Sequence, residues 1–372
     1  MEWRYSQPVT IIFGSNKLNS LHEILNEYGL KNGLLVCDPF FEKNGLSQRV
    51  VELSKGLIKD VFFDITPNPT VENVDSCADI IRKNNIEFLI ALGGGSSLDC
   101  AKASASICKT NDSIREYIGT GKVFNNDSLP IIAIPTTSGT GSEVTCVSVL
   151  TDHKNNIKAP VVHKNFYPKI AIIDPVLTIT VPPYITASTG FDVLAHALEG
   201  FWSKNHQPIC DALAIHAAKL VFENLYDAYV DGSNLAAREK LSEASVIAGL
   251  AFSIPKTAGS HACSYPLTSI YKIPHGEACA FTLDLFTRIN TKVDDRLSYF
   301  ANQLGYDSAY EMADRILELK KMMNMKITLK DAGIKLDDLE ELSKLCMHPN
   351  MLNNPIEMNP SSIKNMFLSL NY

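Results

Sequence analysis

Residues 87–102 read EFLIALGGGSSLDCAK, an apolar run that ends in three glycines and continues into a helix-forming segment. A strand, a glycine-rich turn and a helix in this order are typical of parallel α/β sheets. The glycines allow the backbone to approach a pyrophosphate closely, and the free amides at the start of a helix favour its charge. Because the match to G-x-G-x-x-G is imperfect, a plain strand-to-helix turn is the alternative interpretation.

Neighbouring segments repeat the alternation of strand and helix. The apolar runs VTIIFG, GLLVCD, DVFFDI, LPIIAIPTT and KIAIIDP are mostly separated by helical patterns. This predicts an α/β dinucleotide-binding domain with a mostly parallel sheet. After residue 175, long helical periods such as residues 208–230 replace the strands. We place the boundary at the proline pair of VPPYIT, which gives an α/β domain over residues 1–183 and an all-helical domain over residues 184–372.

Two further strand ends extend the candidate cofactor site. PTTSGTGSE, residues 135–143, offers hydroxyl and amide donors to phosphate or ribose oxygens, although such runs are more often simple turns. Asp38 ends GLLVCD, where a carboxylate can bind the ribose hydroxyls of NAD and repel the extra phosphate of NADP. An aspartate that begins the turn before Pro39 is an equally simple interpretation. A dinucleotide explains both loops, and we expect NADH to be preferred over NADPH.

Composition excludes several classes of partner. The chain has 372 residues and a net charge of -7, with 45% hydrophobic and 20% charged residues, as in ordinary soluble proteins. Basic residues are scattered, which argues against nucleic acid, and no apolar run approaches the ~20 residues of a membrane span. The N-terminus lacks the order of a signal peptide, and nine cysteines without a CxxC pair fit a reducing compartment. We expect a cytoplasmic protein.

The stretch GFDVLAHALEG, residues 190–200, suggests a metal site. It sets Asp192 and His196 four residues apart in a helix-forming segment, so both side chains lie on one face. Such a pair often occurs by chance, and further ligands are needed. His261 and His275 stand in a segment whose prolines and glycine allow it to fold back. One aspartate and three histidines suit Fe(II) or Zn(II).

Together these motifs resemble the iron-containing, or group III, alcohol dehydrogenases over essentially the whole length. The resemblance is carried by GGGSSLDCAK, PTTSGTGSEVT, residues 174–183, TGFDVLAHALE, and SHAC with PHGEA. It implies a catalytic metal in the cleft between the two domains and a homodimer or larger assembly. As metal ligands it implies Asp192, His196, His261 and His275. As residues along the cofactor it implies Gly94, Gly95, Ser96, Asp99, Thr136, Thr137, Thr140, Lys158 and Leu177.

The predicted function is a metal-dependent, NAD(P)-linked alcohol dehydrogenase or aldehyde reductase. Hydride transfer from a nicotinamide leaves negative charge on the carbonyl oxygen, which a divalent metal stabilises as a Lewis acid. Four protein ligands favour Fe(II), with Zn(II) as the alternative, because catalytic zinc more often has three. A 3-dehydroquinate synthase-like lyase and a non-catalytic nucleotide-binding protein are the competing functions. The spacing of Asp192 and His196, followed by two histidines, favours the dehydrogenase.

Two residues near the ligands bear on the substrate. Many relatives carry a histidine where Tyr265 stands, and a phenol is the poorer proton shuttle, so Tyr265 is either catalytic or only shapes the pocket. Lys256 would suit an anionic substrate, or it is a solvated surface lysine. MEWRY, the strand PVTIIFG and the loop around Lys256 are also similar to family members that reduce phosphonoacetaldehyde to 2-hydroxyethylphosphonate, which makes that aldehyde the candidate substrate. Cys263 and Cys279 are interpreted as small buried residues.

Overall fold

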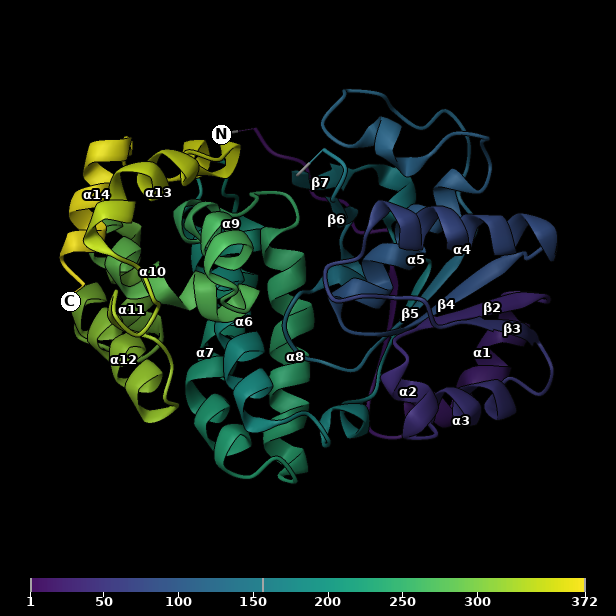
Figure 1. The fold of residues 1–372 in the computed structure, drawn as a ribbon. Coiled ribbons are helices and arrows are strands. Elements are labelled where there is room, and N and C mark those ends of the chain that lie inside the picture. The colour runs from purple at the N-terminus through teal and green to yellow at the C-terminus, as the bar shows by residue number, and fades with distance from the viewer. Residues whose placement is uncertain (1, 156, 371–372) are drawn as a thin grey trace. The chain divides into compact units, whose positions relative to one another are not determined.

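The computed structural model describes residues 2–155 and 157–370, and the chain forms two compact units (Figure 1). The first, called here the sheet unit, contains Ser6–Thr137 and Gly141–Thr178. The second, the helical unit, contains the chain from Ile179 onward, the segment Ser138–Thr140 and the residues up to Tyr5. An α/β N-terminal half and a helical C-terminal half are therefore confirmed.

The sheet unit is built on six parallel strands in the order β1-β8-β5-β4-β2-β3. They are β1 (Thr10–Phe13), β2 (Gly33–Cys37), β3 (Ile58–Phe62), β4 (Phe88–Gly93), β5 (Ile131–Pro135) and β8 (Ile170–Ile173). The parallel sheet confirms the sequence prediction. A separate antiparallel pair, β6 (Val147–Asp152) and β7 (Ile157–Val162), was not expected from the sequence.

Helices cover both faces of the sheet (Figure 1). Because alternate residues of a strand point to opposite faces, Leu34 and Val36 of β2 join the core formed with α4 (Val71–Lys83) and α5 (Gly95–Ile107). Leu35 and Cys37 of the same strand lie in the other core. That core contains side chains of α1 (Leu21–Glu27), α2 (Phe40–Lys43) and α3 (Leu46–Leu53). Strands buried on both faces explain the unbroken apolar runs of the sequence.

The strand order reverses direction between β2 and β4. From β2 the chain continues to β3 on one side, and from β4 it continues to β5 on the other. Open α/β sheets bind ligands outside the carboxyl ends of the strands at such a point. Asp38 directly follows β2, and Gly93, the first of the three glycines, ends β4. Thr136 follows β5, and its amide donates to the Gly93 carbonyl at 3.0 Å. The topology therefore brings the predicted cofactor loops to one edge.

The helical unit contains the nine longer helices of the described chain beyond residue 179. They are α6 (Pro183–Trp202), α7 (Pro208–Val230), α8 (Leu235–Phe252), α9 (Gly259–Tyr271), α10 (His275–Asn290), α11 (Arg296–Gln303), α12 (Ala309–Met322), α13 (Leu339–Leu345) and α14 (Pro360–Leu368). From Thr186 to its end, α6 is buried at every residue except Thr189. A helix that is buried on nearly all sides belongs in a core, and α6 lies in the core of this unit.

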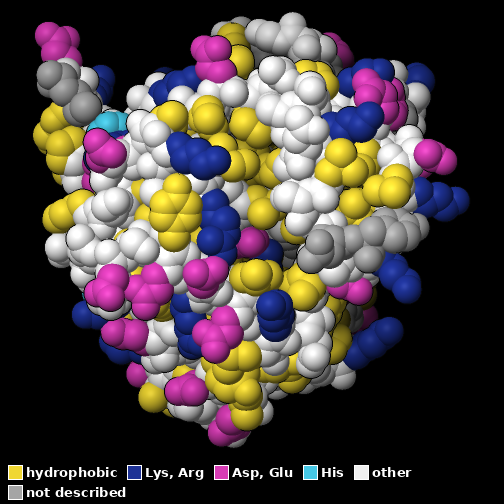
Figure 2. Space-filling model, turned by 90° about the vertical axis from the view of Figure 1, so that its left-hand side faces the viewer, with side chains coloured by type: hydrophobic (Ala, Val, Ile, Leu, Met, Phe, Trp, Pro, Cys, Tyr) yellow, Lys and Arg dark blue, Asp and Glu magenta, His cyan; other side chains and the backbone are white. Residues whose placement is uncertain are grey.

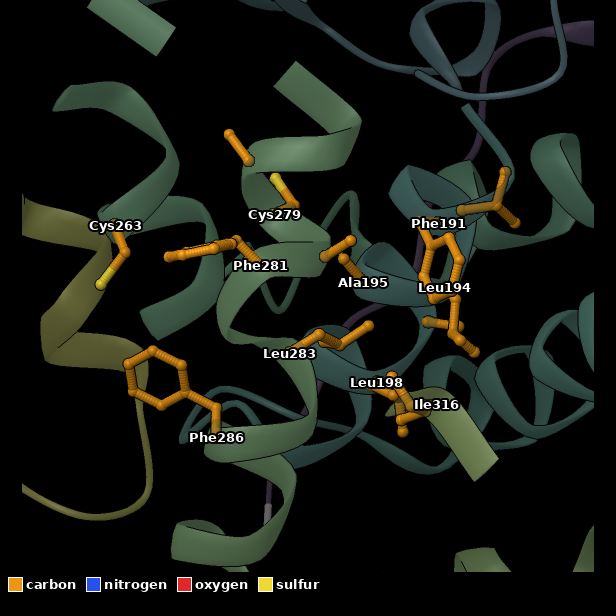
Figure 3. Packing of buried hydrophobic residues seen from close by; sticks show 14 of the residues in the cluster. Phe191, Leu194, Ala195, Leu198, Cys263, Cys279, Phe281, Leu283, Phe286 and Ile316 are labelled. Atoms are coloured by element: carbon orange, nitrogen blue, oxygen red, sulfur yellow. The ribbon is translucent and has the colours of Figure 1, made fainter. Parts of the chain in front are cut away.

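Apolar packing beneath the candidate site joins three helices. Leu194 and Leu198 of α6, Leu283 of α10 and Ile316 of α12 belong to one buried cluster, and Figure 3 shows these side chains close together. Interiors of this kind are close-packed and hold the side chains that border them in fixed positions. The core thus fixes the helices that carry the polar residues described below.

Figure 2 shows acidic, basic and hydrophobic side chains together on one face of the molecule, with several acidic side chains on its lower left. Within residues 2–155 and 157–370, no helix is both long enough and apolar enough to span a bilayer.

Candidate functional site

The four predicted metal ligands come together in the helical unit, on α6 and in the first turns of α9 and α10. The Asp192 Oδ1 atom lies 3.9 Å from His196 Nε2, 3.5 Å from His261 Nε2 and 3.8 Å from His275 Nε2. The Nε2 atoms of His196 and His261 are 3.1 Å apart. Ligands at about 2.1 Å from a common ion are separated from one another by about 3 to 4 Å. These four distances fit ligands of one transition-metal ion.

The electrostatics of the cluster also fit a cation. Within the described residues, Asp192 Oδ1 is buried and has no hydrogen-bond partner, a costly state for a carboxylate without a neighbouring positive charge. Burial alone would raise the pKa of Asp192, but the positive charge that the neighbouring histidines can carry holds that pKa below its ordinary value. Burial lowers the pKa of His196 to about 3, so this imidazole is neutral, as a metal ligand must be. A divalent ion would satisfy the orphaned oxygen.

Cys279 is a further donor that the sequence interpretation left out of the site. Together with Asp192, His261 and His275 it forms a group whose potential ligand atoms lie within 4.8 Å of one another, and His196 is outside that group. Its sulfur is 3.9 Å from His275 Nε2. Cys279 is buried, as expected, but both histidines lower the pKa of its thiol against the effect of burial. The signal was its position four residues after His275, one turn along the same helix.

Glu199 was also missed, although it contacts a predicted ligand directly. Its carboxylate accepts hydrogen bonds from the backbone amides of Ser260, at 2.6 Å, and His261, at 3.2 Å, and its other oxygen bonds His261 Nδ1. This leaves Nε2 of His261 to face the cluster. Metal-binding histidines commonly have such a carboxylate partner. In the sequence, Asp192, His196 and Glu199 share one face of a helix at i, i+4 and i+7, which could have revealed it.

Gly276 allows α10 to approach α6. A Cβ atom at this position would lie 2.0 Å from the Ser188 carbonyl oxygen and 3.1 Å from Asp192 Cβ. Any side chain would therefore push the first turn of α10 away and carry His275 with it. The amide of Glu277 donates to the Ser188 hydroxyl at 3.1 Å and secures the same contact.

One side of the four predicted metal ligands, called here the ligand cluster, is accessible. The His275 side chain is 35% exposed, whereas those of Asp192, His196 and His261 are 6% or less. The Tyr265 ring stands 6.3 Å from the His275 ring, between centroids, on the same helix as His261. Tyr265 is thus beside the accessible ligand, and burial raises the pKa of its hydroxyl.

Lys256 has a local partner. Its amino group donates to the Ser253 carbonyl at 2.8 Å, just past the end of α8. Its backbone adopts the left-handed conformation, with φ of 68°. A cation at the carboxyl end of a helix interacts favourably with the unpaired carbonyls there. Contact between Lys256 and a substrate stays a prediction.

In the sheet unit, the triple glycine forms the start of α5. The helix begins at Gly95, and Gly94 precedes it without a side-chain cap, so the first amides of the helix are available to an anion. Gly93 has φ of +144°, and a Cβ there would lie 2.5 Å from the Ser97 hydroxyl. The turn therefore needs glycine at this point.

Ser96 and Lys158 are linked beside this helix start through Asn68. The Ser96 hydroxyl accepts the Asn68 amide at 3.1 Å, and the Lys158 amino group donates to the Asn68 side chain at 2.8 Å. A serine of the glycine turn and a lysine of β7 thus lie on either side of one asparagine. Asn68 itself was not singled out from the sequence.

Asp99 faces inward. Its carboxylate accepts from the Ser142 hydroxyl at 2.7 Å and from the Val149 amide at 2.9 Å. Lys102, which is fully buried, donates to the same Ser142 hydroxyl at 2.6 Å, and burial lowers the pKa of this lysine to about 8. These contacts tie α5 to the segment that follows β5. Asp99 and Lys102 therefore position the two donor-rich loops.

The remaining predicted cofactor residues occupy different settings. Asp38 Oδ1 accepts the Phe40 amide at 2.7 Å, which is the turn that the alternative interpretation expected. Thr136 is buried, and the Thr137 hydroxyl lies 3.2 Å from where a Cβ on Gly94 would be. Leu177 belongs to the core on the α1 face of the sheet. Thr140 lies in the short segment grouped with the helical unit.

Comparison with known proteins identifies the family. Residues 8–175 match the iron-containing alcohol dehydrogenase model, and residues 186–370 match the C-terminal model of the Fe-containing alcohol dehydrogenase family. The chain is similar to the crystal structure of sulfoacetaldehyde reductase from Bifidobacterium kashiwanohense in complex with NAD+, with 52% identity and a TM-score of 0.97 over 100% of this chain and 99% of that one.

Curated relatives agree with these matches. The NAD-dependent methanol dehydrogenase of Bacillus methanolicus is 32% identical over 348 residues, or 91% of each chain. The 1,3-propanediol dehydrogenase of Citrobacter freundii is 32% identical over 98% of this chain and 97% of its own. Since both halves match the family models and these identities extend along nearly the whole chain, the protein belongs to the iron-containing alcohol dehydrogenases, a family of oxidoreductases.

Proposed function

We propose that the protein is an Fe(II)-dependent, NADH-linked reductase of a small aldehyde that carries an anionic group. The observation that carries this proposal is the convergence of Asp192 Oδ1 with the Nε2 atoms of His196, His261 and His275 at separations of 3.1 to 3.9 Å. Three imidazoles and one carboxylate suit Fe(II), with Zn(II) as the alternative. Cys279 Sγ stands near enough to serve as a further ligand in place of one of them.

Each group in the reaction has a proposed role. A divalent metal supplies Lewis-acid stabilisation of the negative charge that hydride transfer places on the carbonyl oxygen. Asp192 and the three histidines hold it, and Glu199 keeps the His261 ring oriented. The accessible His275 side marks where the aldehyde enters. The free amides at the start of α5 and the carboxylate of Asp38 are proposed to hold the pyrophosphate and the adenosine ribose of NAD.

The substrate proposal combines the sequence with one relative. The protein that is 52% identical is named a sulfoacetaldehyde reductase, and its structure contains NAD+. The sequence alone suggested phosphonoacetaldehyde, another two-carbon aldehyde with an anionic tail. We place the sulfonate first because of this relative and keep the phosphonate as the second candidate.

A panel of aldehydes tests the function. Iron-loaded protein is assayed with NADH and with NADPH against sulfoacetaldehyde, phosphonoacetaldehyde, propanal and butyraldehyde, and oxidation of the cofactor is followed by absorbance. We expect turnover with NADH, fastest with sulfoacetaldehyde, and loss of turnover after chelation. Turnover by protein that has been shown to be free of metal would contradict the proposed metal-dependent mechanism. A preference for the uncharged aldehydes would contradict the proposal that the substrate is anionic.

The assembly and location are also proposals. We propose a homodimer or larger assembly in the cytoplasm, on the basis of the composition and the resemblance to the family. Light scattering of the purified protein tests the assembly, and a monomer at micromolar concentration would contradict it.

A further inference from the structure

A polar group stands beside the accessible face of the ligand cluster and belongs to no role assigned above. Tyr265 lies on α9, and Thr257 lies just before that helix. His348 and Asn350 lie more than eighty residues later, at the start of a 3₁₀ helix, Pro349–Asn353. The rings of Tyr265 and His348 are 4.3 Å apart between centroids, and the Tyr265 ring is 6.3 Å from that of His275. The group thus lies next to His275, the most exposed of the four predicted ligands.

The hydrogen bonds within this group determine which of its atoms remain able to donate. The Asn350 backbone amide donates to His348 Nδ1 at 3.2 Å, so Nδ1 is an acceptor and the neutral ring carries its proton on Nε2. The Asn350 side-chain amide donates to the Thr257 hydroxyl at 2.7 Å and to the Tyr265 hydroxyl oxygen at 3.5 Å. Within the described residues, neither the Tyr265 hydroxyl proton nor His348 Nε2 has a partner in the chain. Two donors are left for a ligand.

The charge of these two donors favours a sulfonate over a phosphonate as their ligand. Burial lowers the pKa of His348, so both donors are neutral at neutral pH. Two neutral donors suit a weakly basic anion with a single charge, such as a sulfonate. A phosphonate carries nearly two charges at neutral pH and is normally bound by arginine or lysine. The nearby cation Lys256 already donates to the Ser253 carbonyl.

We propose that Tyr265 and His348 form the subsite that recognises the sulfonate tail of the aldehyde, with Asn350 as the residue that orients both. The Tyr265 hydroxyl and His348 Nε2 each donate to a sulfonate oxygen, while the aldehyde carbon reaches the ligand cluster beside His275. This inference rests on the proposed aldehyde reduction and adds what recognises the substrate. No charge transfer or covalent step is required of either residue.

Two variants that keep an aromatic ring test the subsite. Tyr265→Phe and His348→Phe remove one donor each and retain the ring contact. The readout is the ratio of kcat/KM for sulfoacetaldehyde to kcat/KM for propanal, measured with NADH. Because a hydrogen bond to a charged group contributes roughly 1.5–3 kcal/mol, we expect the ratio to fall about 10- to 100-fold in each variant. His216→Gln, an exposed position bonded to Glu243, serves as the control that keeps the ratio. A ratio unchanged in both variants overturns the subsite.

A binding measurement separates failure of the subsite from failure of the function. Isethionate, the alcohol product that carries the sulfonate, is titrated by calorimetry into iron-loaded protein containing NADH, with which it cannot react. We expect binding to the wild type and at least 10-fold weaker binding to both variants, with circular dichroism spectra unchanged. Equal binding to all three proteins refutes the subsite even if aldehydes are reduced. Selective binding without any turnover supports the subsite and refutes the reductase.

Discussion

Glu199 and His261, sixty-two residues apart in the sequence, are joined by a carboxylate–imidazole contact inside the helical unit. The same carboxylate accepts the backbone amides of Ser260 and His261, so it holds both the ring and the first turn of α9. Glu199 is fully buried on α6, one turn beyond His196. A predicted ligand on one helix is therefore oriented by the helix that carries two other predicted ligands.

Replacing Glu199 with glutamine should weaken metal binding more than it weakens the fold. The amide cannot accept as strongly from His261 Nδ1, so the ring loses its fixed orientation and some of its basicity. Removal of such partners typically costs about 10- to 100-fold in metal affinity. The measurement is competition for Fe(II) or Zn(II) against a chelator of known affinity. Glu341→Gln, at an exposed position of α13, is the control. Equal affinity in both variants would show that Glu199 only packs.

The site illustrates what sequence could and could not predict. Asp192 and His196 are readable because a helix brings residues four apart onto one face, and the parallel sheet is readable because strands buried on both faces are apolar throughout. The partners of Glu199 and the pairing of Tyr265 with His348 depend on contacts between distant segments. Periodicity contains no information about such contacts, since they are set by tertiary packing.

The same limit applies to residues with two plausible roles. From the sequence, Asp38 fits both a ribose ligand and a turn residue, and the structure contains the turn. The sequence shows no cationic neighbour for Cys279 and predicts only a buried residue, whereas in the structure His261 and His275 are its neighbours. His261 and His275 stand in a segment that folds back through its prolines, a geometry that the sequence permits but does not specify.

Gly276→Ala should separate α10 from α6. Its Cβ would meet the Ser188 carbonyl oxygen at 2.0 Å, a contact that only movement of the backbone relieves. We expect a loss of about 1–3 kcal/mol in the free energy of unfolding and weaker metal binding, because His275 moves with its helix. Thermal unfolding with and without Zn(II) measures both effects.

Gly200→Ala is the matched comparison for this change. The nearest backbone atoms there are 3.3 Å from the added Cβ, so the variant should lose less stability and retain metal binding. If the two variants bind metal equally well, the close approach at Gly276 does not position His275.

Glu143 gives the stability a dependence on pH whose sign can be stated. Burial raises the pKa of its carboxyl from 4.5 to about 7. Between these two values the unfolded chain has lost the proton that the folded chain retains, so this residue makes the folded state less stable as pH rises. The effect is fully developed above pH 7 and amounts to on the order of 3 kcal/mol.

Glu143→Gln removes this titration. Relative to the wild type, the variant should become more stable as pH rises from 4.5 to 7 and show no further change above that range. Urea unfolding of metal-free protein at pH 5, 6, 7 and 8 measures the difference. The exposed Glu52→Gln on α3 is the control and should run parallel to the wild type. A Glu143→Gln curve that is also parallel would place the carboxyl pKa near its ordinary value.

Asp38 should decide between NADH and NADPH, and a single substitution separates its two roles. Asp38→Asn removes the charge but keeps an oxygen that can accept the Phe40 amide, so the turn after β2 survives. If the carboxylate repels the additional phosphate of NADPH, the ratio of kcat/KM for NADH to that for NADPH should fall at least 10-fold, which corresponds to about 1.4 kcal/mol. Asp79→Ala, exposed on α4, controls for the change in net charge. A ratio that does not change in Asp38→Asn would leave Asp38 as a turn residue alone, because the variant preserves the turn and removes only the electrostatic discrimination.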